Sequence, residues 1–215
     1  MLRFSPRLAD DATVLCLGAH CDDVEIGCGG TLVELMRRNP RLRFEWVLFS
    51  GRGEREAETR QAAVALMGKH ARLNVTVHDF RTSYFPHCAS EIKDAFESLR
   101  REFNPDLIFT HYLADRHQDH RVLAELTWNT FRNHAVLEYE IPKFDGDLAQ
   151  PGVFCAVSED IVDLKIRALM DNYPTQRTHQ WFDEDLFRGL MRLRGIECNS
   201  PTRFAEAFHA RKLVL

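Results

Sequence analysis

Residues 13–30 read TVLCLGAHCDDVEIGCGG, and this stretch decides the fold. Its first six residues are a short run of apolar β-formers, which is typical of a buried strand in a parallel sheet. Polar residues follow the run and predict a loop. Residues 29–38 carry apolar side chains at helical spacing, and Asn39-Pro40 predicts the end of that helix. A buried strand, a loop and a helix are the first half of a βαβ unit.

The same alternation continues outward from this unit. Strands are predicted over 44–49, 75–80, 106–110, 136–141 and 153–157, and helices over 54–67, 91–103, 119–131, 160–170 and 183–193. Strands that alternate with helices of this length predict a mainly parallel sheet with helices on its faces. We therefore expect an α/β fold, a single Rossmann-like domain that spans residues 1–215.

Composition narrows the class of protein further. The 215 residues are 45% hydrophobic and carry a formal net charge of −4, so no basic excess is present to neutralise a phosphate backbone. No apolar run reaches the roughly 20 residues that a membrane span needs. Residues 1–7 lack the pattern of a signal peptide. These features predict a cytoplasmic protein with six reduced cysteines, no transmembrane segment and no nucleic-acid partner.

Two polar loops follow predicted strands at distant points of the chain. One loop follows the strand at 13–18, and the other covers residues 110–120 after the fourth strand. Parallel strands end at the same edge of a sheet, where ligands bind near the topological switch point. We therefore expect six side chains to meet at this edge of the sheet: His20, Asp22, Asp23, His117, Asp119 and His120.

Two imidazoles and one carboxylate with open positions are typical of a catalytic zinc or non-haem iron(II) ion. His20 and Asp23 are three residues apart in a tight loop, so both can reach one ion. His120 is the expected third ligand. The predicted cofactor is therefore Zn²⁺, with Fe²⁺ as the alternative.

The remaining polar residues suit hydrolysis beside such an ion. A carboxylate is needed to take a proton from water, and Asp22 is the candidate. His117 is expected to stabilise the oxyanion or protonate the leaving group. Asp119 is expected to orient a histidine, and His117 is the predicted partner. His111 receives no assignment from the sequence.

The two loops resemble the motifs of the PIG-L/LmbE-like zinc deacetylases. Residues 19–30 are similar to the family's AHPDDxExGCGG signature and residues 117–121 to its HxDH motif. Residues 50–68, 165–176 and 205–208 are similar to further family segments. The resemblance implies zinc held by His20, Asp23 and His120, with Asp22 as general base. Arg55 matches a substrate-contacting arginine of the family.

Family members remove the acetyl group from N-acetylated amino sugars, so the resemblance implies a substrate of the N-acetylglucosamine type in a glycoconjugate or metabolite. The sequence departs from the pattern at Cys21, where proline is usual, and at Thr175, where serine is usual. The thiol of Cys21 is expected to pack away from the metal. Four aromatic residues could stack on a sugar ring, and Trp181 is the better candidate for a wall of the cleft, whereas Trp128 is expected in the core; the other two are Phe144 and Tyr173.

Three other functions remain open. The same metal chemistry serves an amidase that acts on a thiol conjugate or another non-sugar N-acyl compound. A non-catalytic sugar-binding module is a second alternative, although the complete set of ligands and base argues against it. An iron(II) oxygenase is disfavoured because its ligand set typically sits in a β-helix fold, whereas this chain predicts α/β.

Overall fold

The computed structural model describes residues 8–213, so the segment 1–7 considered above lies outside it. Within the described residues, seven strands form one sheet in the order β3-β2-β1-β4-β5-β7-β6. The strands are β1 Thr13–Gly18, β2 Arg43–Leu48, β3 Arg72–Val77, β4 Leu107–His111, β5 Ala135–Tyr139, β6 Val153–Val157 and β7 Phe204–His209. All neighbours pair in parallel except β7, which is antiparallel to both β5 and β6. The prediction of a mainly parallel α/β sheet is confirmed.

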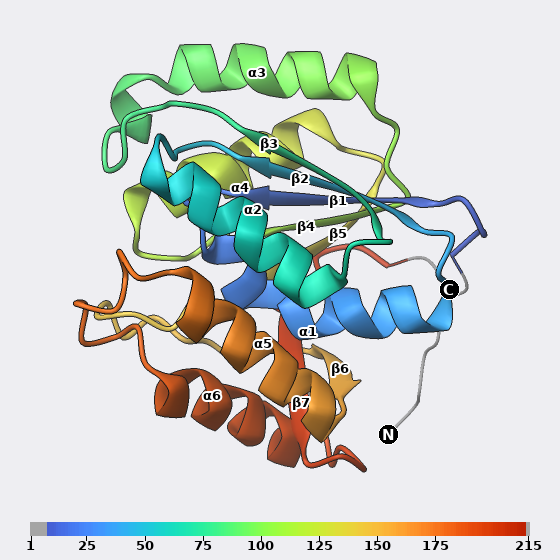
Figure 1. The fold of residues 1–215 in the computed structure, drawn as a ribbon. Helices are drawn as coiled ribbons and strands as arrows, with labels where there is room; N and C mark the ends of the chain where they lie inside the picture. The colour runs from blue at the N-terminus through green and yellow to red at the C-terminus, as the bar shows by residue number, and fades with distance from the viewer. Residues whose placement is uncertain (1–7, 214–215) are drawn as a thin grey trace.

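Helices cover both faces of this sheet (Figure 1). They are α1 Asp23–Arg38, α2 Glu54–Met67, α3 Ala89–Glu102, α4 Gln118–Thr130, α5 Glu159–Asn172 and α6 Glu184–Glu197, with a 3₁₀ turn η1 at Phe85–His87. One core cluster joins the sheet to α1, α2, α5 and α6, and a second joins it to α3 and α4. None of the helices in 8–213 is long and apolar enough to cross a membrane.

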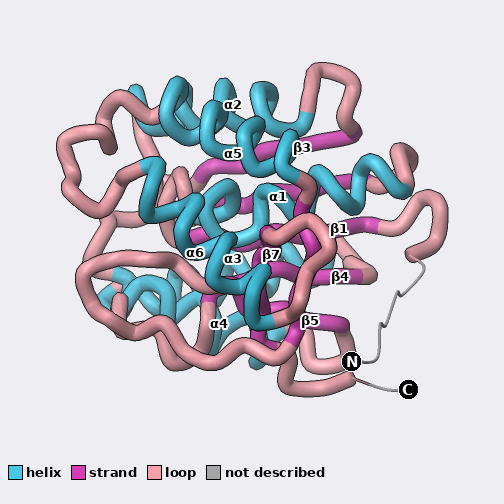
Figure 2. Tube along the Cα trace, turned by 90° about the horizontal axis from the view of Figure 1, so that it is seen from below, coloured by secondary structure: helices cyan, strands magenta, loops and turns pink. Residues whose placement is uncertain are grey.

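The order of the strands places a topological switch at β1. This strand pairs with β2 on one side and with β4 on the other, so the chain winds outward in opposite directions from it. The loops after β1 and β4 are therefore neighbours at the carboxyl edge, where ligands bind in open α/β sheets. Figure 2 shows β3, β1, β4 and β5 in succession, with long loops at the end opposite the chain termini.

Helix α1 begins earlier than the sequence predicts. Its first residue is Asp23 rather than Gly29, so the glycine-rich part of the signature is helical and not loop. Glycine is a poor helix former, but here close packing outweighs propensity. A Cβ on Gly27 would lie 2.2 Å from the ring of Tyr139, and one on Gly29 would lie 2.9 Å from Leu66. These glycines let α1 approach the sheet and α2.

Strand β7 was not predicted, because it is formed by antiparallel pairing with the distant strands β5 and β6. It lies between β5 and β6 and is largely buried.

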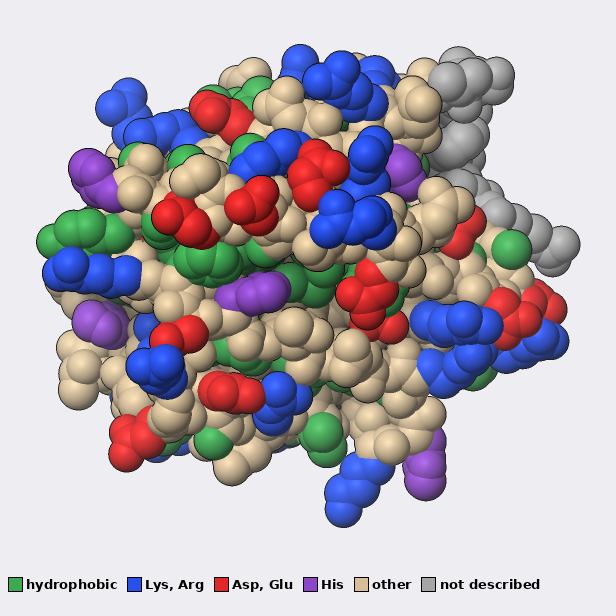
Figure 3. All heavy atoms as spheres, turned by 90° about the horizontal axis from the view of Figure 1, so that it is seen from above, with side chains coloured by type: hydrophobic (Ala, Val, Ile, Leu, Met, Phe, Trp, Pro, Cys, Tyr) green, Lys and Arg blue, Asp and Glu red, His purple; other side chains and the backbone are tan. Residues whose placement is uncertain are grey.

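On the face of the molecule around α3, acidic and basic side chains are interspersed rather than gathered into a patch of one sign (Figure 3).

Candidate metal centre and active site

The loop after β1 and the first turn of α1 provide three of the predicted residues. His20 lies in the loop, Asp22 is the N-cap of α1 and Asp23 is its first residue. An aspartate at an N-cap commonly accepts a hydrogen bond from the helix, but the Asp22 side chain makes no such bond. Instead, Asp23 accepts from the backbone N–H of His20 at 2.6 Å, which closes the loop.

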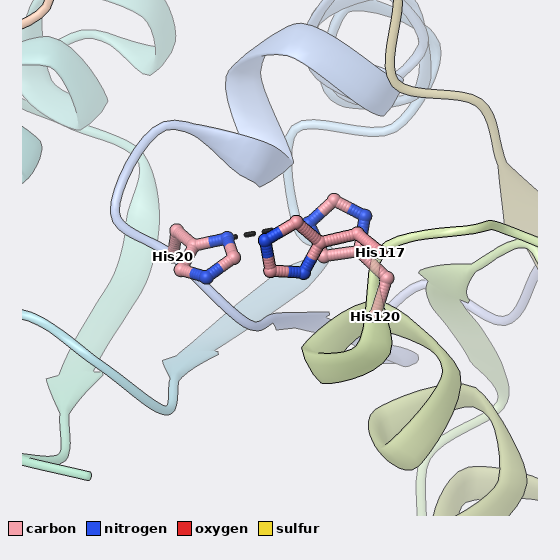
Figure 4. A group of neighbouring side chains, drawn as sticks. All are labelled: His20, His117 and His120. Carbon is pink, nitrogen blue, oxygen red and sulfur yellow. Dashed lines mark hydrogen bonds between the residues drawn. The ribbon is translucent and has the colours of Figure 1, made fainter. Parts of the chain in front are cut away.

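The start of α4 provides the other three residues. His117 is the N-cap of α4, and its Nδ1 accepts a hydrogen bond from the backbone N–H of Asp119 at 3.2 Å. His120 lies in the first turn, with only 2% of its surface exposed. Figure 4 shows the rings of His117 and His120 beside that of His20, which comes from the other loop. The two loops thus meet as the sequence predicts.

The three predicted ligands lie close together, and the shortest contacts to the two histidines use different oxygens of Asp23. His120 Nε2 lies 3.2 Å from His20 Nδ1, and His20 Nδ1 lies 3.4 Å from Asp23 Oδ2. His120 Nε2 is 3.7 Å from Asp23 Oδ1. Two donor atoms bound at about 2.1 Å to one tetrahedral ion are about 3.3 Å apart. The spacing of these donor atoms therefore fits a zinc-sized ion.

Carboxylates fix the outer nitrogens of both imidazoles. His20 Nε2 lies 3.2 Å from Asp119 Oδ2, and His120 Nδ1 lies 2.9 Å from Asp115 Oδ2. A metal-binding histidine commonly donates its other N–H to a carboxylate in this way. The pairing predicted for Asp119 was therefore wrong, because its carboxylate contacts His20 and not the ring of His117. Asp115 was missed by the sequence argument, although it lies in the same loop.

The donor atoms of this site are arranged to bind a cation. When the outer nitrogen of each ring donates to its carboxylate, the inner nitrogens present lone pairs to each other and to Asp23. In the absence of an ion, burial opposes charge on His20, but the Asp23 and Asp119 carboxylates outweigh it and raise its pKa to about 10, so a bound metal would displace a proton from this ring. Burial lowers the pKa of His120 to about 3, which keeps it neutral as a ligand must be. The site thus favours positive charge at the point where the donors meet.

A second set of donors involves His111, the residue without a predicted role. His111 Nε2 is 3.1 Å from Asp23 Oδ2, and its ring stacks on that of His120 with 3.9 Å between centroids and 15° between planes. The donor atoms of Asp23, His111 and His120 all lie within 4.8 Å of one another, so these residues form a second group that could hold an ion. His111 Nε2 is also 3.0 Å from the backbone N of Ala19. His111 therefore suits a role in holding Asp23 and the loop.

His117 offers a third way to complete a donor set, because its ring nitrogen lies within 4.8 Å of donor atoms of both His20 and His120. Its Nδ1 is already occupied as an acceptor, so the proton of the neutral ring belongs on Nε2. Burial and the neighbouring His20 lower the pKa of His117. A neutral ring with Nε2–H beside the donor cluster is a hydrogen-bond donor for a ligand.

Asp22 has the environment of a general base. Arg55, in the first turn of α2, donates from Nη2 to Asp22 Oδ1 at 3.0 Å. Asp22 Oδ2 is buried and has no hydrogen-bond partner within the described residues. Burial raises the pKa of Asp22 above its usual value, although the Arg55 guanidinium opposes this shift. One oxygen is thus held and the other is free to accept a proton.

The backbone before Asp22 is clamped by hydroxyl groups. Tyr173 and Thr59 donate to the carbonyl oxygen of Cys21 at 2.7 and 2.9 Å. Tyr173 is fully buried, so the prediction that it stacks on a sugar was wrong. Burial raises the pKa of the Cys21 thiol to about 11, which keeps it protonated. Trp181 is half-buried and packs against Phe182.

Comparisons of the sequence with known proteins identify related chains. The family model described as "PIG-L: GlcNAc-PI de-N-acetylase" matches residues 15–131. The chain is 27% identical over 167 residues to YaiS of Escherichia coli K12, described as an uncharacterised deacetylase, an alignment that covers 73% of this chain and 88% of that protein.

Solved structures share the fold. N,N'-diacetylchitobiose deacetylase from Pyrococcus horikoshii superposes with a TM-score of 0.69 at 20% identity, over 94% of this chain and 84% of that one. The 4-carboxy-2-hydroxymuconate hydratase GalB from Pseudomonas putida KT2440 superposes with a TM-score of 0.72 at 14% identity, over 95% and 98% of the two chains. Because one neighbour is a deacetylase and the other a hydratase, the fold alone does not fix the reaction.

Proposed function

The chain belongs to the PIG-L family of metal-dependent de-N-acetylases, and from this premise we propose that it removes the acetyl group from an N-acetylated amino sugar with zinc as its metal. The observation that carries the proposal is the convergence of His20, Asp23 and His120 beside a carboxylate whose free oxygen is buried. The family and the relatives named above favour an amide substrate. The sugar and the metal are our inference.

His20, Asp23 and His120 would hold the ion. When bound, a divalent metal lowers the pKa of a water ligand toward about 7 and polarises a carbonyl group. Asp22 Oδ2 takes the proton of the attacking water, because Oδ1 is held by Arg55 while Oδ2 is free. Burial raises the pKa of Asp22, which makes its carboxylate a stronger base than an exposed one.

His117 serves as an electrophile in this scheme. Its Nδ1 accepts from the backbone N–H of Asp119, so Nε2–H is available to donate to the developing oxyanion. The lowered pKa of the ring favours this neutral donor over an imidazolium acid. The proton held by Asp22 then passes to the departing nitrogen. Water and the amide thus become acetate and a protonated amine, because the second proton of the attacking water also ends on the departing nitrogen, and the protein keeps no net proton.

A substrate panel tests the proposal. The zinc-loaded protein is offered N-acetylglucosamine, diacetylchitobiose, alkyl N-acetylglucosaminides and N-acyl amines without a sugar, and free amine is measured. We expect release from at least one sugar. Release only from the non-sugar amides would instead identify an amidase, and bound metal without release from any compound would favour a binding module.

The role of Asp22 is tested in the same assay. Asp22→Asn keeps the size of the side chain but removes the base, so we expect turnover to fall by about 100-fold or more while bound metal is retained. Asp145→Asn, which changes an exposed aspartate, is the control and is expected to behave like the wild type. Near wild-type turnover by Asp22→Asn would show that Asp22 is not the base.

A further inference from the structure

A buried lysine lies behind the candidate metal ligand His120. Lys143 belongs to the connection between β5 and β6, and 9% of its side chain is exposed. Its ammonium nitrogen lies 2.9 Å from Asp115 Oδ2 and 2.8 and 2.7 Å from the two carboxylate oxygens of Asp147. An ammonium group enclosed by two carboxylates is well compensated in a buried setting.

The oxygen that Lys143 contacts is the one that faces the ligand. Asp115 Oδ2 lies 2.9 Å from His120 Nδ1, so the ammonium and the imidazole N–H share one acceptor. Asp115 Oδ1 accepts from the backbone N–H of His117 at 2.7 Å. Asp147 Oδ2 accepts from the backbone N–H of Arg116 at 2.7 Å. The two carboxylates therefore bind both Lys143 and the loop that leads into α4.

We propose that Lys143 is a positioning residue that acts through Asp115 to hold His120 ready for the metal. The inference rests on the proposed role of His120 as a ligand. The Lys143 ammonium and His120 Nδ1 contact the same oxygen of Asp115, so the ammonium group fixes the position of the carboxylate that accepts from the His120 ring. The ring then keeps its orientation and directs the Nε2 lone pair toward His20 and Asp23.

Removal of the ammonium group breaks this chain of contacts. Asp115 would keep a buried negative charge with one fewer partner, and its carboxylate would be free to turn toward other donors. This movement loosens the restraint on the His120 ring. Loss of a residue that orients a metal-binding histidine typically weakens metal binding by about 10–100-fold.

The test is a metal-binding measurement that does not depend on turnover. Zinc affinity is measured by competition with a chelator, and the absorption spectrum of the cobalt-loaded protein reports the geometry around the ion. We expect Lys143→Met to weaken zinc binding by about 10–100-fold and to change the cobalt spectrum. Lys143→Arg keeps the positive charge and should restore most of the affinity. Lys93→Met, which changes a lysine on α3, is the matched control and should leave both properties as in the wild type.

A double-variant cycle separates this role from a general structural one. If Lys143 acts through Asp115, Lys143→Met should add little to the effect of Asp115→Asn, whereas independent effects would add. Wild-type affinity and spectrum in Lys143→Met, or additive effects in the cycle, would overturn the proposal. If Lys143→Met does not fold, Lys143→Gln and Lys143→Arg are compared, and equal zinc affinity in these two would also overturn it. Failure of the wild type itself to bind zinc or cobalt would instead contradict the proposed function.

Discussion

The half of the fold that ends with α4 and the half that begins with β5 make different contributions to the candidate centre. The six site residues predicted from the sequence, which include the candidate base Asp22, all come from the first half. They lie in the loops after β1 and β4 or in the first turns of the helices that follow these loops. The second half contributes side chains that bind backbone groups and carboxylates of the first. Tyr173 donates to the Cys21 carbonyl, Lys143 to Asp115, and Glu206 accepts from the backbone of α1.

The boundary between the two halves coincides with the end of the segment that the family model matches. The matched residues 15–131 cover the first half, and the clamping residues lie beyond them. The difference indicates that the reacting groups lie on short loops after parallel strands, and that contacts from residues after 131 help to place them. Variants of the first half should therefore remove the reaction and leave the fold. Variants of the second half should change stability, metal affinity or rate by smaller factors.

The largest effect is expected in the first half, at His120. His120→Ala removes one of three donors whose spacing fits an ion, so we expect metal content and deacetylation both to fall by more than about 1,000-fold. Metal analysis after dialysis and the release of amine measure these losses. His70→Ala, which removes an exposed histidine, is the control. A His120→Ala protein that retains metal and turnover would show that His120 is not a metal ligand, and the contrast between the two halves would then fail.

The next largest effect is a loss of stability, which is expected when a buried ion pair of the second half is broken. Lys165 Nζ lies 2.6 Å from Glu206 Oε1, and both side chains are 3% exposed. Lys165 also donates to the Ile26 carbonyl, while Glu206 accepts from the Gly30 N–H four residues later in α1. Lys165→Met leaves a buried carboxylate without its cation, which typically costs about 3–5 kcal/mol.

Urea unfolding of the metal-free protein measures this change in the free energy of unfolding. Lys93→Met again serves as the control, because its partner Glu97 is partly exposed and such helix pairs contribute about 0.3–0.5 kcal/mol. The turnover of folded Lys165→Met protein should stay within a few-fold of the wild type. A large loss of turnover without loss of stability would place Lys165 among the reacting groups and contradict the division.

The sequence predicts local elements in both halves, because strand β6 has the predicted bounds, whereas strand β3 in the first half lies three residues before its predicted position. Strand β1 and helix α2 have the predicted bounds, because apolar runs and helical periodicity are local signals. The two site loops were found because parallel strands share a carboxyl edge. Asp115 was not found, since the partner of a carboxylate depends on how α4 is rotated. Lys143 was missed because it lies in a turn-rich stretch without periodicity.

The start of α1 shows a different limit. Residues 19–28 were interpreted as a loop because polar residues follow the strand, and Gly27 has a low helix propensity. The helical state is favoured by contacts of Gly27, Gly29 and Gly30 with Tyr139, Leu66 and Glu206, which are 37 to 176 residues further along the chain. The β7 strand also pairs with distant segments. Such long-range contacts decide these elements, and a single sequence does not reveal them.

The smallest effect is expected where the two halves meet, at Tyr173. Its hydroxyl lies 2.7 Å from both the Cys21 carbonyl and Glu25 Oε1. Burial raises the pKa of Glu25 to about 8, so at neutral pH Glu25 is protonated and can donate to Tyr173 while Tyr173 donates to Cys21. Tyr173→Phe removes this relay, and Thr59 alone then holds the carbonyl at 2.9 Å.

Because one hydroxyl remains on the Cys21 carbonyl, Asp22 should be displaced slightly rather than released. We expect kcat to fall by up to about tenfold with unchanged zinc affinity, and stability to fall by about 1–2 kcal/mol. Steady-state kinetics with zinc titration measure the first two quantities. Thr59→Val removes the other hydroxyl, and the double variant should lose more rate than the two single variants together predict. If Tyr173→Phe lowers stability but leaves kcat unchanged, the second half supports the fold at this point without placing the base.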